Sequence, residues 1–296
     1  MHTDDSPRGW ATVLGMALAS ICSYSTTIAA LSVLSLAAAS ISGHPALATL
    51  PGALMLATSG LLTYRVSLAM QRHGRRALFI AGALAGIAGG LLCLLALFEK
   101  QFLLLFPGVM LLGAFLSSSG YYRFTAAENV APGQVPRAIA MVLAASLVAA
   151  LAGSHVTALA ERLTGPVPYA GALAIMVLAP AAALLPIGLT PMRQAAKAPA
   201  GGGAKVALPL REVMAVPAIR LGLGATITGQ MCMALMMQST PLSMQGHGFA
   251  MHESAHVIQW HVIGMFGPAL FSGEIVKRWG ARATIVAGLV LFAISA

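Results

Sequence analysis

The sequence predicts an all-α fold, a polytopic bundle of transmembrane helices, on the basis of three observations. Of the 296 residues, 58% are hydrophobic and only 8% are charged, against roughly 25% charged residues in an ordinary soluble domain. Long runs without Asp, Glu, Lys or Arg follow one another along the chain, and about 20 apolar residues suffice to cross the hydrocarbon core of a bilayer. Lys and Arg are concentrated in alternate connections between these runs.

Six helices are expected before residue 190. The first charge-free run, between Arg8 and Arg65, is too long for one crossing. It is divided at 40–46, "SISGHPA", because Gly43 and Pro45 favour a turn, and it therefore predicts helices at 10–38 and 46–68. Shorter charge-free runs predict the next four helices, at 77–98, 102–124, 138–160 and 167–190.

A polar stretch rich in Gly, Pro, Ala and basic residues follows at 191–216, and this composition is typical of a flexible linker. Three more helices are expected at 218–240, 254–273 and from 283 onward. The last run reaches Ala296 before it completes a crossing, so we expect the chain to be truncated. The predicted domains are a six-helix bundle at 1–190, a cytoplasmic linker at 191–216 and the first part of a second bundle at 217–296.

The positions of Lys and Arg predict how the helices cross the membrane. Most basic residues lie near the N-terminus, after the second, fourth and eighth helices, and in the linker. All these segments fall on one side, which the positive-inside rule makes cytoplasmic, together with the N-terminus. The net charge of +9 thus reflects topology, so we expect the lipid bilayer as a partner and no nucleic acid.

Two connections in the chain repeat the same pattern of residues. "SLAMQRHGRR" at 67–76 follows the second helix, and "GEIVKRWGAR" at 273–282 follows the eighth. Both contain Arg-x-Gly-x-Arg: Arg72, Gly74 and Arg76 in the first copy, and Arg278, Gly280 and Arg282 in the second. Equivalent loops six helices apart indicate two homologous halves.

This repeated loop, with a long linker after the sixth helix, resembles the major facilitator superfamily of secondary transporters, whose loop reads G-x-L-a-D-R-x-G-R-R. The first copy matches that pattern at Arg72, Gly74, Arg75 and Arg76. It departs from the family's glycine and aspartate at Ser67 and Gln71.

The second copy matches the family's loop at Gly273, Arg278 and Gly280, and it has Lys277 in the acidic position. Because both aspartates are replaced, the family's acidic charge relay is not expected in these loops. The stretches "YYRFTAAENVAPGQVPRAIAMVLA" at 121–144 and "IQWHVIGMFGPALFSG" at 258–273 resemble a bacterial branch of the superfamily.

The resemblance implies a function as well as a fold. By that likeness the protein is a multi-pass secondary active transporter of the bacterial inner membrane, with twelve helices in two bundles around a central cavity. It would move a small molecule by alternating access, driven by a substrate gradient or by a coupling ion such as the proton. No phosphate loop for ATP occurs in the sequence. We expect a monomer without a cofactor, and the substrate stays open.

The stretch "MHESAH" contains a zinc motif, H-E-x-x-H, formed by His252, Glu253 and His256. It suggests an alternative function, a membrane zinc metalloenzyme, but zinc needs a third ligand. The candidate, Glu274, lies about 27 Å away along a continuous helix. We therefore interpret the motif as the start of a helix, with Glu253 at the positive end of the helix dipole, and expect no metal. A further alternative is a truncated fragment that transports nothing.

Five residues in the predicted spans are candidates for a cavity or a gate: Tyr122, Arg123, His155, His256 and Gln259. Arg123 either extends to the cytoplasmic surface or pairs inside the bundle with an acid or an anionic substrate. His155 either takes part in a proton relay or packs as a hydrogen-bonded residue. His256 and Gln259 share one face of the eighth helix, and either line the outer half of a transport cavity or bond to a neighbouring helix.

Overall fold

The computed structural model describes residues 7–164, 167–192 and 210–295, and within these ranges every regular element is a helix. Seven of the described helices are long and apolar enough to cross a membrane, and a shorter apolar helix covers Arg282–Leu291. The predicted fold class, an all-α bundle of membrane helices, is confirmed.

The helices before residue 190 follow the predicted order closely. They are α1 (Pro7–Ser42), α2 (Leu50–His73), α3 (Arg75–Phe98), α4 (Leu105–Ser119), α5 (Tyr122–Glu128), α6 (Val135–Thr164) and α7 (Ala170–Leu189). One difference concerns the predicted helix at 102–124, which is a 3₁₀ turn (Phe102–Leu104) followed by α4 and the short helix α5. The break comes after three consecutive serines, at Gly120 and Tyr121.

The remaining helices are α8 (Leu210–Ala215), α9 (Pro217–Gly246) and α10 (Met251–Ser295). The backbone of α10 leaves the helical conformation at Gly280 (φ 79°, ψ 157°), where the sequence predicts the connection between its eighth and ninth helices. Most of the predicted linker, 193–209, lies outside the described residues, and α8 occupies its last part. The division into domains stays a prediction.

The glycines of α3 allow it to pack tightly against two neighbours. A Cβ atom built on Gly89 would lie 2.6 Å from the carbonyl oxygen of Gly108 in α4, and one built on Gly90 would lie 2.6 Å from the carbonyl oxygen of Met176 in α7. Both distances are shorter than van der Waals contact, so only glycine fits between these backbones. Helix α1 packs on α7 and on α6.

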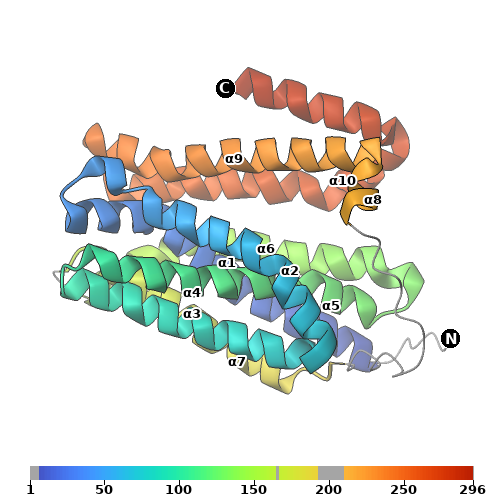
Figure 1. Cartoon of the computed structure of the whole chain (residues 1–296), viewed down its shortest axis with the longest axis horizontal. Helices are drawn as coiled ribbons and strands as arrows, with labels where there is room; N and C mark the ends of the chain where they lie inside the picture. Colours follow the sequence, from blue (N-terminus) through green and yellow to red (C-terminus); the bar gives the residue numbers. More distant parts are fainter. Residues whose placement is uncertain (1–6, 165–166, 193–209, 296) are drawn as a thin grey trace.

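Figure 1 shows the long helices lying roughly side by side, with α9 and α10 forming a layer along one side of α1 to α7. This layer packs mainly on two helices, with α10 on α6 and α9 on α1, and Gln245 of α9 also donates to the Tyr169 hydroxyl before α7 at 3.1 Å. The turn between α2 and α3 and the turn at Gly280 lie at the same end of the bundle as the described start of α1. We call this the loop end.

Two groups of buried apolar residues fix the position of the cavity described below. At the loop end, the loop-end cluster joins α1 to α3, α5, α6 and α7, through residues such as Met16, Phe79, Tyr122 and Ile187. Farther along, the inter-half cluster joins α1 and α6 to α9 and α10, through Ile28, Leu31, Ala149, Ala150, Met237, Ile258 and Val262. Among the described residues, α9 and α10 contribute to the inter-half cluster and not to the loop-end cluster.

Candidate functional site

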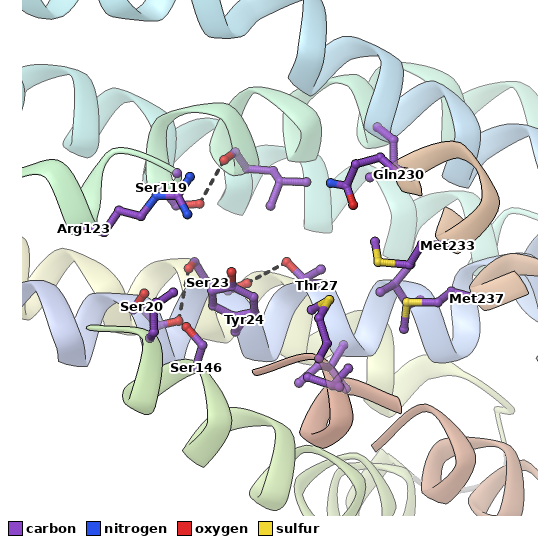
Figure 2. Close-up of a pocket in the computed structure, with 18 of the residues that line it drawn as sticks. Ser20, Ser23, Tyr24, Thr27, Ser119, Arg123, Ser146, Gln230, Met233 and Met237 are labelled. Carbon is purple, nitrogen blue, oxygen red and sulfur yellow. Dashed lines mark hydrogen bonds between the residues drawn. The ribbon is translucent and has the colours of Figure 1, made fainter. Parts of the chain in front are cut away.

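A cavity of about 360 Å³ lies between α1, α2, α4, α5 and α6 on one side and α9 and α10 on the other. Its volume falls in the range of roughly 300–1,000 Å³ that is usual for small-molecule sites. Figure 2 shows that Arg123 and Ser119 lie at one end, Gln230, Met233 and Met237 at the other, and Tyr24 between them. The two ends of the cavity thus differ in chemistry.

Helix α1 presents a face of hydroxyl groups to this cavity, formed by Ser20, Ser23, Tyr24 and Thr27. The spacing i, i+3, i+4, i+7 puts all four residues on one side of a helix. Two of these hydroxyls are bonded within the helix: Ser23 Oγ donates to the carbonyl oxygen of Ser20 at 3.1 Å, and Thr27 Oγ1 donates to that of Ser23 at 3.0 Å. We call these four residues the α1 hydroxyl face.

Serines on α4 and α6 extend the polar wall of the cavity. Ser119 Oγ donates to the carbonyl oxygen of Leu116 at 3.1 Å, and Ser146 Oγ donates to that of Val142 at 3.3 Å. Ser146 also shares a side-chain hydrogen bond with Tyr24. The donor of Ser119 is therefore used by a carbonyl of its own helix, which leaves its oxygen lone pairs available, whereas the Ser146 hydroxyl is shared between α6 and Tyr24.

Arg123, on the short helix α5, is the one formally charged side chain among the described residues that line the cavity. Its neighbour Tyr122 holds α5 in place, because it is fully buried and packs edge-on against Phe79 with 4.8 Å between the ring centroids. Successive residues of a helix point about 100° apart, so Tyr122 faces the loop-end cluster while Arg123 faces the cavity. The Arg123 guanidinium carbon also lies 5.0 Å from the ring centroid of Phe124.

The opposite end of the cavity is built by α9 and α10 and is mostly apolar. It contains Met233 and Met237, with the amide of Gln230 as its polar group; Met265 of α10 also lines the cavity. Methionine side chains are flexible and polarisable, and they make favourable contacts with aromatic rings. This end is suited to a flat, weakly polar group.

Two of the other candidate cavity residues lie outside the cavity lining. Gln259 is half-buried and donates from Nε2 to the carbonyl oxygen of Leu151 on α6 at 2.9 Å, and the side chain of His256 is exposed. Instead, α10 contributes Val262 and Met265 to the cavity. That His256 and Gln259 line a transport path stays a prediction, and the side chain of His155 lies outside the described residues.

The two basic loops share an unusual backbone conformation. Gly74 has φ 85° and ψ 157°, and Gly280 has φ 79° and ψ 157°, a region that only glycine adopts readily. The matching torsions support the interpretation of the two loops as copies of one ancestral turn. Ser67 is half-buried, whereas Gln71, Arg72, Arg278 and Arg282 are exposed; the side chain of Lys277 and the environment of Gly273 lie outside the described residues.

The first basic loop is tied to two neighbouring segments. Arg75 forms a salt bridge with Glu128 at the end of α5, and Arg76 donates to the carbonyl oxygen of Thr190 just after α7. Arg75 is largely buried, and Glu128 is about half exposed. These contacts connect the turn between α2 and α3 to α5 and α7 at the loop end.

The zinc motif lies at the start of α10. Glu253 Oε2 accepts a hydrogen bond from the backbone N–H of Ala250 at 2.7 Å, which is a common arrangement at the N-terminus of a helix. The side chain of Glu274 lies outside the described residues. In the part of the chain that the structure describes, no three His, Cys, Asp or Glu side chains are grouped so that they could hold a metal ion.

The α1 hydroxyl face and the methionine end were not predicted from the sequence. A weak signal for the first is visible, since hydroxyl-bearing residues are concentrated in 20–27, but they lie on several faces of the helix. The sequence shows no comparable signal for Gln230 or the methionines, because their role depends on how α9 meets α1.

Comparison with known proteins adds a family and several relatives. A family model described as Major Facilitator Superfamily matches residues 16–296. The chain is similar to the riboflavin transporter RfnT of Brucella anthropi, with 32% identity over 259 residues that cover 86% of this chain and 64% of the relative. No solved structure matches the chain.

Two proteins of Bacillus subtilis are also similar, and both are named uncharacterized MFS-type transporters. YddS is 26% identical over 280 residues, which cover 88% of this chain and 62% of YddS. YdeG is 25% identical over 259 residues, which cover 82% of this chain and 59% of YdeG. The chain thus spans about three fifths of the length of the curated relatives it matches.

Proposed function

The chain belongs to the major facilitator superfamily, and from this premise we propose that it is a secondary transporter that moves a small organic molecule across the bacterial inner membrane by alternating access. The observation that carries the proposal is the position of the cavity, which is lined by α1, α4, α5 and α6 from one half and by α9 and α10 from the other. In such transporters, substrate sites lie between the two halves, which rock around them.

The packing on either side of the cavity supports this mechanism. The inter-half cluster joins the two halves at the cavity wall, since Ile28, Met237 and Val262 belong to both, whereas in the described residues the loop-end cluster receives no side chain from α9 or α10. We propose that this arrangement corresponds to a state open toward the loop end. With the N-terminus and the basic loops in the cytoplasm, as the positive-inside rule predicts, that state faces inward.

We propose riboflavin as the first cargo to test. The relative that is named a riboflavin transporter is 32% identical to this chain, and the cavity has a volume suited to a drug-sized ligand. Riboflavin combines a flat tricyclic ring with an uncharged chain of hydroxyl groups. The methionine end and the α1 hydroxyl face offer contacts of both kinds.

The test uses a bacterial strain that can neither make nor import riboflavin. Expression of the protein from its own gene should restore growth at low external riboflavin and should give saturable uptake of radiolabelled riboflavin. Collapse of the proton gradient should reduce that uptake if protons supply the energy. Protein that is present in the membrane at normal levels but gives no uptake and no export of riboflavin would refute this cargo.

The metalloenzyme alternative receives no support from the described residues. His252 and His256 lack a third possible ligand there, and Glu253 is engaged at the start of α10. The family that matches the chain and its named relatives are transporters and not enzymes.

A further inference from the structure

We infer that the cavity selects an uncharged cargo rich in O–H or N–H donors, and that it orients this cargo with the donor-rich chain along the α1 hydroxyl face and the flat ring among the methionines. The inference rests on the transport function proposed above and specifies the substrate class of the same site. It concerns how this chain's own residues discriminate between ligands.

The first step concerns the hydrogen-bonding character of the polar wall. A serine or threonine hydroxyl has one donor and two lone pairs. Ser23, Thr27 and Ser119 each donate to a carbonyl oxygen of their own helix. Their donors are therefore occupied, and the wall offers acceptors to whatever fills the cavity. A cargo that brings donors satisfies these oxygens, and a cargo with acceptors alone does not.

The second step concerns the shape of this wall. Ser20, Ser23 and Thr27 follow one another at one-turn intervals, so the α1 hydroxyl face extends over roughly 10 Å. Hydroxyl oxygens in a row of this kind can be reached by a linear chain that carries several donors along its length. A compact ligand with a single donor would reach only one of them.

The third step concerns charge. Arg123 is the single formal charge among the described lining residues, and no carboxylate accompanies it. A cationic ligand would therefore be repelled and would lose its hydration without compensation. A phosphate ester carries about −1.5 to −2 charges near neutral pH, which one guanidinium cannot balance. An uncharged cargo avoids both costs and can still accept a hydrogen bond from Arg123.

The fourth step concerns the orientation of the cargo. In Figure 2 Arg123 and Ser119 lie at the end opposite to Gln230, Met233 and Met237. A planar ring gains more from methionine sulfur and methyl groups than from the serine wall. The amide of Gln230, which offers both a donor and an acceptor, can pair with the polar edge of such a ring. The hydroxyl chain then extends past Tyr24 toward Arg123.

The experiment compares two flavins that differ only in the chain. Riboflavin carries the hydroxyl chain, and lumiflavin carries the same ring with a methyl group in its place. The protein, expressed from its own gene and purified in detergent, is titrated with each ligand while flavin fluorescence is recorded. Flavin mononucleotide, which adds a phosphate to the chain, serves as the charged probe.

The variant Ser23→Ala/Thr27→Val removes two acceptors from the α1 hydroxyl face. Its matched control, Ser25→Ala/Thr26→Val, removes two hydroxyls from the same helix that are bonded to the carbonyl oxygens of Ile21 and Cys22 and that do not line the cavity. We expect the cavity variant to weaken riboflavin binding about 10-fold or more and lumiflavin binding less than about 2-fold. The control should change neither by more than about 2-fold.

Each other outcome has a definite meaning. If the cavity variant weakens both flavins equally, or neither, the hydroxyl chain does not lie on α1 and the inference is wrong, although the cargo stands. If flavin mononucleotide binds the unaltered protein as tightly as riboflavin, the selection for an uncharged cargo is wrong. If the unaltered protein binds neither riboflavin nor lumiflavin, both the proposed cargo and the inference are wrong.

A cavity variant that elutes as an aggregate is replaced by Thr27→Val alone. We expect this single change to weaken riboflavin binding about 3-fold or more and to leave lumiflavin binding unchanged.

Discussion

The close packing of α3 predicts that a single methyl group at Gly90 destabilises the protein. A Cβ atom at this position would lie 2.6 Å from the carbonyl oxygen and 2.7 Å from the carbonyl carbon of Met176. Both are backbone atoms, so they cannot rotate away and α3 and α7 must separate. Overpacking of this kind costs about 1–3 kcal/mol. Alanine is favoured over glycine inside a helix by about 0.5–1 kcal/mol, which offsets part of the loss.

The matched control for Gly90→Ala is Gly60→Ala, because a Cβ atom at Gly60 in α2 meets no atom within 4 Å. Both changes gain the same helix propensity, so the difference between the two variants isolates the overpacking cost. At about 2–4 °C per kcal/mol, Gly90→Ala should melt about 2–12 °C below Gly60→Ala. The assay is thermal unfolding of the purified proteins in one detergent, followed by loss of the monodisperse peak in size-exclusion chromatography. Equal melting temperatures, or a higher one for Gly90→Ala, would refute the packing argument.

Three further predictions concern the loop end and α10. Gly74→Ala should lower the free energy of unfolding by about 1–3 kcal/mol, because alanine is strained at φ 85° and ψ 157°; Gly188→Ala, which meets no atom within 4 Å, should cost nothing in the same thermal assay. Glu128→Gln should cost at most about 1 kcal/mol of unfolding free energy, because the Glu128 carboxylate is about half exposed. The double variant Arg75→Glu/Glu128→Arg should be more stable than Arg75→Glu alone, and a cost of Glu128→Gln several times larger would contradict the exposure argument. Gln259→Ala should cost about 0.5–1.5 kcal/mol through the lost bond to α6 and leave the initial rate of riboflavin uptake within about 2-fold; a larger fall in uptake with normal stability would put Gln259 on the cargo path.

The helices could be predicted from the sequence because charge and hydropathy act locally along the chain. Charge-free runs of sufficient length must form helices in a bilayer, since no water is there to satisfy the backbone. The break between α4 and α5 was missed because the run 101–122 carries no charge and predicts one helix, although three serines and Gly120 lie at the break. In the structure Tyr122, at the start of α5, packs against Phe79 of α3.

The candidate site could be predicted only in part, because it depends on contacts between helices that are far apart in the sequence. Arg123 could be singled out because a charged side chain within a membrane span is costly, so it usually faces a cavity or a partner inside the bundle. Ser20, Ser23 and Thr27 could not be distinguished from Thr26 or Ser25, because α1 carries hydroxyls on several faces. The face of α1 that lines the cavity depends on where α6 and α9 pack against it. Both helices are far from α1 in the sequence, so this packing cannot be read from the pattern of α1 alone.

The bonding of the cavity hydroxyls has a consequence for the unloaded protein. A buried donor that loses its partner costs about 1–3 kcal/mol, and several such donors would hold a carrier in whichever state water could reach them. In this cavity Ser23, Thr27 and Ser119 already donate to carbonyl oxygens of their own helices. Under the transport function proposed above, release of a cargo would leave none of these three donors without a partner.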